Sequence, residues 1–113
     1  MKVKQLFPEV NLRFQFSFKD HKFIPKESGC YVLTSFEDEI LYVGLTNNLN
    51  SRFAKHRNSR EKCQKTSQGT VFWFYYLTCE EREINRVERG WLNQHVELHG
   101  ALPVLNKVNS PVS

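Results

Sequence analysis

Hydrophobic and polar side chains alternate near the start of the chain, and this pattern predicts a β-strand. Within residues 11–18 every second side chain is apolar: Leu12, Phe14, Phe16 and Phe18. A period of two over this length is typical of a strand with one buried face. We therefore expect a strand at 11–18, inside an N-terminal extension that spans residues 1–27.

Three further apolar runs predict the strands of a central sheet. Residues 30–35 and 40–44 are separated by a short acidic segment, so we expect them to pair as an antiparallel hairpin. Residues 71–77 are apolar throughout, without alternation. Such a run indicates a strand covered on both faces, and so a central position in the sheet.

A first helix is predicted directly after the hairpin. Leu49 and Phe53 are four residues apart and would lie on one helix face, and Thr46 or Asn47 can cap its start. Residues 57–70, which follow this helix, show no periodicity. We expect them to form an irregular, mobile loop.

A second, longer helix is predicted after the last strand. Thr78 and Glu81 have the spacing of a capping box, and Gly100 is suited to end the helix. The order of elements predicts an α+β fold with a central three-stranded antiparallel sheet flanked by helices, plus the extra N-terminal strand. We expect this domain to span residues 28–107 and a loose tail to span 108–113.

Composition agrees with a single globular domain. The chain has 113 residues, of which 40% are hydrophobic and 25% charged. Its three cysteines form no CxxC pair, which argues against a disulfide framework or a zinc knuckle and favours a reducing compartment. No leader segment and no apolar run of about 20 residues is evident. We therefore expect a cytoplasmic protein that does not enter a membrane.

Positive charge is concentrated in one part of the chain. The net charge is +4, yet residues 52–65 alone carry six basic residues against the single acid Glu61. The basic residues are Arg52, Lys55, Arg57, Arg60, Lys62 and Lys65. Such a patch on a near-neutral body is typical of phosphate binding, and we expect these residues to contact nucleic acid. Charge alone leaves a solvated basic loop equally open.

Two triplets and four single residues give the chain a family resemblance. Gly29-Cys30-Tyr31 resembles the GIY triplet, and Tyr42-Val43-Gly44 resembles the YIG triplet. Later residues also fall in the matching elements: Arg52, His56, Glu88 and Asn106. Over roughly residues 28–107 the sequence resembles the GIY-YIG nuclease family. That family joins one catalytic module to diverse other parts in an excision-repair subunit, homing endonucleases and restriction enzymes.

The resemblance implies a metal-dependent endonuclease that hydrolyses nucleic-acid phosphodiester bonds, with DNA as the expected substrate. It implies one divalent ion, Mg²⁺ or Mn²⁺, held by the carboxylate of Glu88 together with waters and phosphate oxygens. Glu88 adjoins the apolar stripe of its helix, where a carboxylate needs a partner; a solvated glutamate is the alternative. The guanidinium of Arg52 would bind the non-bridging phosphate oxygens.

The sequence distinguishes less clearly between the residues that could transfer protons. We favour Tyr31 as the general base and Tyr42 as the group that positions water or phosphate, although strand tyrosines are more often core rings. A tyrosine titrates near pH 10, so its ionisation would need help from the metal and Arg52. His56 would share the proton transfer or bind phosphate. Asn106 is expected to hold the site together by hydrogen bonds.

The chain departs from the family pattern at two places near the triplets. Cys30 replaces the middle Ile of the first triplet, and because it is small and apolar we do not interpret it as a nucleophile. Leu45 follows the second triplet, where some members carry Lys. If that lysine activates a tyrosine elsewhere, His56 or Arg52 must do so in this chain.

Other interpretations stay open. The chain could be a nucleic-acid-binding module with an inactive site, or a protein-interaction domain that uses its surplus of aromatic residues. Target choice would depend on the N-terminal strand, on the 57–70 loop, on a partner protein or on homodimer formation; a monomer is equally possible. His95 and His99 are four residues apart and could bind zinc, but with no further ligand evident we expect histidines on a helix surface.

Overall fold

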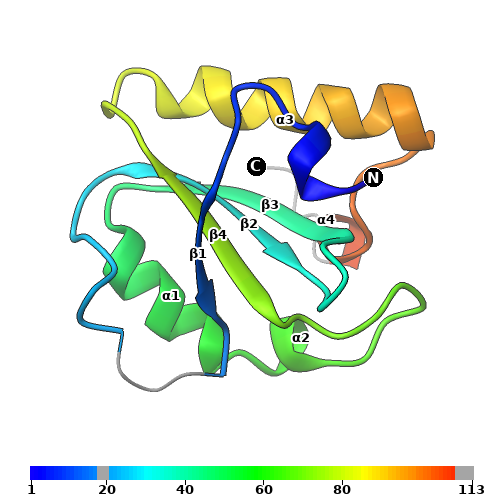
Figure 1. Cartoon of the computed structure of the whole chain (residues 1–113), viewed down its shortest axis with the longest axis horizontal. Helices are drawn as coiled ribbons and strands as arrows, with labels where there is room; N and C mark the ends of the chain where they lie inside the picture. Colours follow the sequence, from blue (N-terminus) through cyan, green and yellow to red (C-terminus); the bar gives the residue numbers. More distant parts are fainter. Residues whose placement is uncertain (18–20, 109–113) are drawn as a thin grey trace.

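The protein is built around a four-stranded antiparallel sheet whose strands are ordered β1-β4-β2-β3 (Figure 1). The computed structural model describes residues 1–17 and 21–108, without the side chains of 107 and 108. The strands are β1 (Leu12–Gln15), β2 (Gly29–Thr34), β3 (Ile40–Thr46) and β4 (Trp73–Thr78). The helices are η1 (Val3–Gln5), α1 (Leu49–Arg57), α2 (Arg60–Cys63), α3 (Ile84–His99) and α4 (Val104–Val108).

The architecture confirms the predicted α+β fold. β2 and β3 form the expected hairpin, in which Tyr31 lies opposite Gly44. β4 lies between β1 and β2, as its unbroken apolar sequence predicts. None of the helices within residues 1–17 and 21–108 has the length and hydrophobicity of a membrane span.

Helices pack on both faces of the sheet, because alternate side chains of each strand point to opposite sides. One core, with α3, contains Val32, Tyr75 and Trp91. The other, with α1, contains Phe53 and Phe74. Figure 1 shows α3 and α1 on opposite sides of the strands. Residues of α1 and of α3 can therefore meet only near an edge of the sheet.

The N-terminal extension belongs to the same core as α3. Val3, Leu6 and Val10 are buried with the residues of that core. The indole nitrogen of Trp91 donates to the carbonyl of Pro8 at 3.0 Å. The first residues of the chain are therefore fixed against α3 as well as, through β1, against β4.

The N-terminal strand is shorter than predicted. It ends at Gln15 rather than at residue 18, which lies outside the described residues. Leu12 is 58% exposed, although the alternation placed it on the buried face. β1 is a short strand at the sheet edge, so the core covers Phe16 but does not extend to Leu12.

The segment 57–70 is not an irregular loop throughout, since it contains α2. The hydroxyl of Ser59 caps this helix by accepting from the backbone N–H of Lys62. Four residues form a single turn, which is too short for a hydrophobic period to be recognised. α4, at the C-terminal end of the described chain, was not predicted for the same reason.

The predicted helix starts also need correction. Asn48, not Thr46 or Asn47, caps α1, with its side chain accepting from the backbone of Ser51. α3 begins only at Ile84 and has no side-chain cap, so the capping box at Thr78 does not form. Gly100 does end α3, in the left-handed conformation with φ 86°.

His95 was wrongly expected on a helix surface. It is fully buried, and its Nδ1 lies 2.6 Å from the carbonyl oxygen of Ala101. His99, one turn later, is exposed. His95 therefore joins the end of α3 to the segment that leads into α4.

Candidate active site

A tyrosine from β2 and a histidine from α1 form a buried hydrogen-bonded pair. The Tyr31 hydroxyl lies 2.6 Å from Nε2 of His56. Tyr31 is 1% exposed and His56 7% exposed. Leu49 and Phe53 are buried where α1 packs on this face of the sheet. This packing places the last turn of α1 over Tyr31.

Both members of the pair are held in their neutral forms. Burial lowers the pKa of His56 to about 3, and the charges of Lys62 and Arg52 act in the same direction. Burial also raises the pKa of Tyr31, and the neighbouring Tyr42 adds to the effect while Arg52 opposes it. At neutral pH a phenol therefore meets an uncharged imidazole.

Tyr42 lies beside this pair and is more accessible. Its ring centroid is 6.1 Å from that of Tyr31 and 5.4 Å from that of His56. Its side chain is half-buried. Burial raises the pKa of Tyr42, whereas the Tyr31 hydroxyl and the Arg52 guanidinium lower it.

Gly44 explains why the second triplet needs a glycine. A Cβ at this position would lie 2.5 Å from the hydroxyl oxygen of Tyr31 and 2.9 Å from the ring of Tyr42. Atoms cannot approach so closely without displacement of the rings. The glycine is therefore what allows the two tyrosines to approach across the hairpin.

Lys62 reaches the site from α2. Its Nζ lies 4.5 Å from the ring centroid of Tyr42, and the residue is only 6% exposed. The sequence placed Lys62 with the surface basic residues and gave no sign of this contact. No periodicity marks α2, so nothing in the sequence indicated which of its side chains faces inward.

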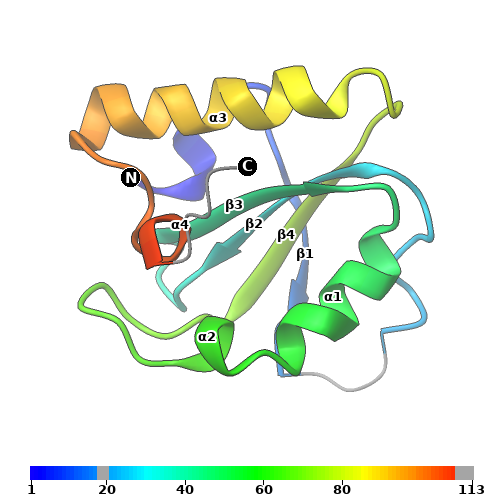
Figure 2. The same ribbon diagram turned by 180° about the vertical axis from the view of Figure 1, so that it is seen from behind.

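Arg52 and Glu88 bring opposite charges to the same tyrosines. Arg52, half-buried on α1, lies one turn before His56. Glu88, half-buried on α3, raises the pKa values of Tyr31 and Tyr42 electrostatically, while Arg52 lowers them. Figure 2 shows β3, the edge strand that carries Tyr42, with α3 on one side of it and α1 on the other.

The carboxylate of Glu88 fits a divalent cation. Burial raises its pKa, with the charge of Arg89 opposing. Among the described residues no hydrogen bond or ion pair to this carboxylate is found, and no group of three His, Cys, Asp or Glu side chains could form a metal cage. One carboxylate completed by waters and phosphate oxygens is an arrangement that Mg²⁺ accepts.

Asn106 connects α4 to the edge strand β3. Its Oδ1 accepts from the backbone N–H of Val43 at 2.9 Å, and its Nδ2 donates to the carbonyl of Val43 at 3.0 Å. Val43 is the residue between Tyr42 and Gly44. This double contact fits the expected structural role of Asn106, since it fixes the backbone that carries Tyr42.

The six basic residues of the 52–65 segment do not form one uniform surface. Lys55, Arg60 and Lys65 are exposed. Arg52 and Arg57 are half-buried and Lys62 is buried. Only the exposed members are free to act as a general electrostatic patch.

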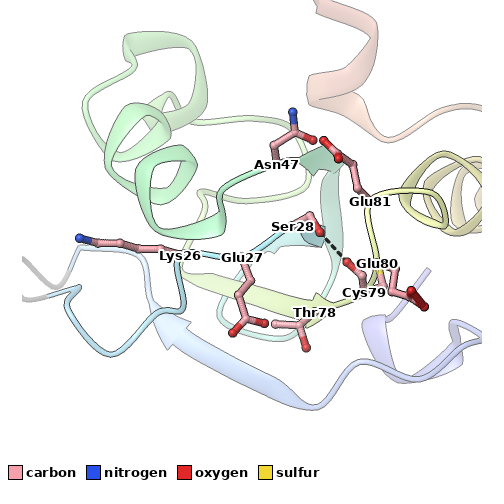
Figure 3. Close-up of a pocket in the computed structure, with 8 residues that line it drawn as sticks. All are labelled: Lys26, Glu27, Ser28, Asn47, Thr78, Cys79, Glu80 and Glu81. Atoms are coloured by element: carbon pink, nitrogen blue, oxygen red, sulfur yellow. Dashed lines mark hydrogen bonds between the residues drawn. The ribbon is translucent and has the colours of Figure 1, made fainter.

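A pocket of about 520 Å³ lies elsewhere, between the start of β2 and the end of β4 (Figure 3). Its lining includes Glu27, Glu80 and Glu81 against the single cation Lys26. Inside it, the Ser28 hydroxyl donates to the Cys79 carbonyl at 2.6 Å. Because its acidic side chains outnumber its one cation, and because it contains none of the site residues described above, this pocket does not suit a phosphate group.

Comparison with known proteins agrees with the triplets. Residues 27–99 match the family model of the GIY-YIG catalytic domain. The chain belongs to the GIY-YIG family. Asn106 lies beyond the matched GIY-YIG segment, whereas the other five site residues lie within it.

This GIY-YIG chain also has a similar region in a much longer protein. It is 30% identical over 76 residues to the UvrABC system protein C of Aster yellows witches'-broom phytoplasma (strain AYWB). The match covers 66% of the chain and 13% of that protein. The chain therefore spans a small part of this relative, and the two findings together support a nuclease.

Proposed function

We propose that the protein is an endonuclease that hydrolyses phosphodiester bonds of nucleic acid, expected to be DNA, with one divalent ion, Mg²⁺ or Mn²⁺. One observation carries the proposal: the buried Tyr31–His56 pair lies beside Tyr42, and the charges of Arg52 and of the unpaired Glu88 carboxylate both act on these tyrosines. Binding of an anionic ligand through a metal would satisfy that carboxylate.

Glu88 would hold the ion, which on binding supplies positive charge to the phosphate and to the leaving oxygen. Arg52 would bind the non-bridging oxygens through its planar guanidinium. The Tyr31–His56 contact and the Asn106–Val43 contacts would keep the two tyrosines in place while the substrate binds.

The sequence favours Tyr31 as the general base, whereas the burial of the two tyrosines supports the opposite assignment. Tyr31 is 1% exposed and its hydroxyl is already bonded to His56, so an attacking water has little access to it. Tyr42 is more exposed. We therefore assign the proton transfer from water to Tyr42, and the support of its ring to Tyr31.

The proposal is tested by cleavage of labelled single-stranded, duplex and branched DNA, with an RNA control. Each substrate is incubated with Mg²⁺, with Mn²⁺ or with EDTA, beside Glu88→Gln, which keeps the size of the side chain and removes its charge. We expect metal-dependent cutting that Glu88→Gln abolishes. In the same assay Tyr42→Phe should lose about 10²-fold or more, the usual contribution of a general base, and Tyr31→Phe less.

Two outcomes would contradict the proposal. Cutting that persists in Glu88→Gln would remove Glu88 from the metal site. No cutting of any substrate, with salt-sensitive binding intact in both proteins, would identify a nucleic-acid-binding module with an inactive site.

A further inference from the structure

A second pocket lies next to the proposed active site, on the α1–α2 side of the sheet. It has a volume of about 440 Å³ and is formed where the end of β1, the segment before β4 and the junction of α1 with α2 meet. Figure 2 shows these segments together at one end of the sheet. Two of the lining residues, Arg57 and Cys63, directly follow His56 and Lys62, which contact Tyr31 and Tyr42. The pocket therefore adjoins the site.

The walls of this pocket combine apolar surface with a cation. Phe16 and Val71, both buried in the core beneath α1, supply apolar surface. Among the described residues, the one charged side chain of the lining is that of Arg57. Its guanidinium lies 3.5 Å from Nδ1 of His21 and over the ring of Phe53, with Cζ 5.7 Å from the ring centroid. Such walls suit a flat, uncharged ring that is attached to an anion.

An unpaired nucleobase of a nucleic-acid strand has this chemistry. Unpaired bases stack on aromatic rings and guanidinium planes, whereas a paired base is enclosed in the duplex and cannot enter a pocket. A volume of about 440 Å³ is typical of pockets for small ligands. The lining also contains polar, exposed residues that can hydrogen-bond to a base edge: Ser17, Asn58 and Thr70. Lys55 and Arg60, exposed on the two bordering helices, can bind phosphates of the same strand.

We propose that this pocket receives one unpaired nucleobase of the strand that is cut, so that the protein selects single-stranded or extrahelical nucleotides over continuous duplex. The inference rests on the proposed function, in which Arg52 binds the phosphate beside Tyr42. Because Arg57 and Cys63 adjoin residues that contact the two tyrosines, the base belongs to a nucleotide close to the phosphate that is attacked. No covalent bond is made or broken in the pocket.

Cys63 makes the occupancy of the pocket measurable. Its residue is exposed, and its thiol lies 3.2 Å from the carbonyl oxygen of Arg57. Cys79 lines the other pocket, between β2 and β4, and serves as an internal reference, while Cys30 is buried. Alkylation with N-ethylmaleimide, followed by mass spectrometry of the peptides, therefore gives a separate rate for each thiol.

The test compares oligothymidine with an abasic strand of the same length, which keeps the backbone and lacks the bases. Each strand is used with EDTA, at about ten times its own Kd as measured by fluorescence anisotropy. We expect oligothymidine to slow the alkylation of Cys63 about tenfold, the factor by which binding reduces the free protein. The abasic strand and a fully paired duplex should slow it less than about twofold, and the rate at Cys79 should change less than about twofold throughout.

Alkylation also provides the converse measurement. The adduct on Cys63 should fill the pocket and weaken the binding of oligothymidine about tenfold, the usual cost of losing one stacked base. Binding of the abasic strand should stay unchanged. Cys63→Ser, treated in the same way, carries no adduct in the pocket and should keep its affinity for both strands.

Equal protection of Cys63 by the two strands would show that the backbone alone covers the thiol and would overturn the inference, as would protection by neither strand. Because these measurements need no cleavage, a failure of the proposed function is recognised separately. Base-selective protection in a protein that does not cut would support the pocket and contradict the nuclease. Cutting without base-selective protection would contradict the pocket alone.

Discussion

Single residues in the site act mainly by limiting what their neighbours can do. Gly44 leaves room for the Tyr31 hydroxyl, which a Cβ would meet at 2.5 Å. Nε2 of His56 lies within hydrogen-bond distance of that hydroxyl, at 2.6 Å. The low pKa of His56 keeps its imidazole from taking up a proton near neutral pH. Tyr42 is the more accessible of the two tyrosines.

The lowered pKa of His56 predicts a dependence of stability on pH. The folded-state pKa of about 3 lies below the unfolded value of 6.5, so the unfolded chain binds the proton first. His56 therefore contributes stability above pH 6.5 that is lost as the pH falls towards 3. Between about pH 7.5 and 4.5, urea unfolding of the wild type should lose about 2–3 kcal/mol more than His56→Gln, which cannot titrate.

The comparison between these two proteins isolates His56 from other titrating groups. His95, whose pKa is also lowered by burial, is present in both. The same loss of stability on acidification in wild type and variant would mean that folding does not lower the pKa of His56. The imidazole would then take up a proton as the pH falls through 6.5, and a His56 that stays neutral down to about pH 3 would be ruled out.

At the scale of elements, the long ones were predictable and the short ones were not. Apolar residues recur over enough positions to predict the long elements. These are the strands at 30–35, 40–44 and 71–77 and the helix that ends at Gly100. α2 and α4 have four and five residues, which leave no period to recognise. Site residues on long elements could therefore be placed in advance, whereas the inward direction of Lys62 could not.

α4 shows how a short element can hold the site. Asn106→Ala would remove both hydrogen bonds to Val43 and leave its N–H and carbonyl unpaired on the edge strand. We expect a loss of about 1–3 kcal/mol in the free energy of unfolding and faster hydrogen exchange at the Val43 amide. Asn93→Ala, at an exposed position on α3, should change stability by less than about 0.5 kcal/mol. Equal effects of both variants would contradict the docking role of Asn106.

Across the whole molecule, charge is distributed unevenly around the sheet. The exposed basic residues of the 52–65 segment lie on α1, on α2 and just beyond, close to the face that carries Tyr42. The pocket with three glutamates and one lysine lies between the start of β2 and the end of β4. The N-terminal extension packs on α3, in the other core. We therefore expect a polyanion to be attracted to the side where Arg52 and Tyr42 are found.

This asymmetry predicts which lysines and arginines set the salt dependence of nucleic-acid binding. Each phosphate contact contributes about 0.9 to the slope of log Kd against log salt concentration on duplex DNA. With EDTA present to prevent cutting, replacement of Lys55, Arg60 and Lys65 by Gln should lower the slope by about one to three units. The matched replacement of Lys4, Lys22 and Lys26, also exposed, should lower it by much less. If both triple variants reduced the slope equally, DNA would be attracted by the net charge of +4 and not by the α1–α2 side, and the predicted role of the exposed basic residues of the 52–65 segment would be wrong.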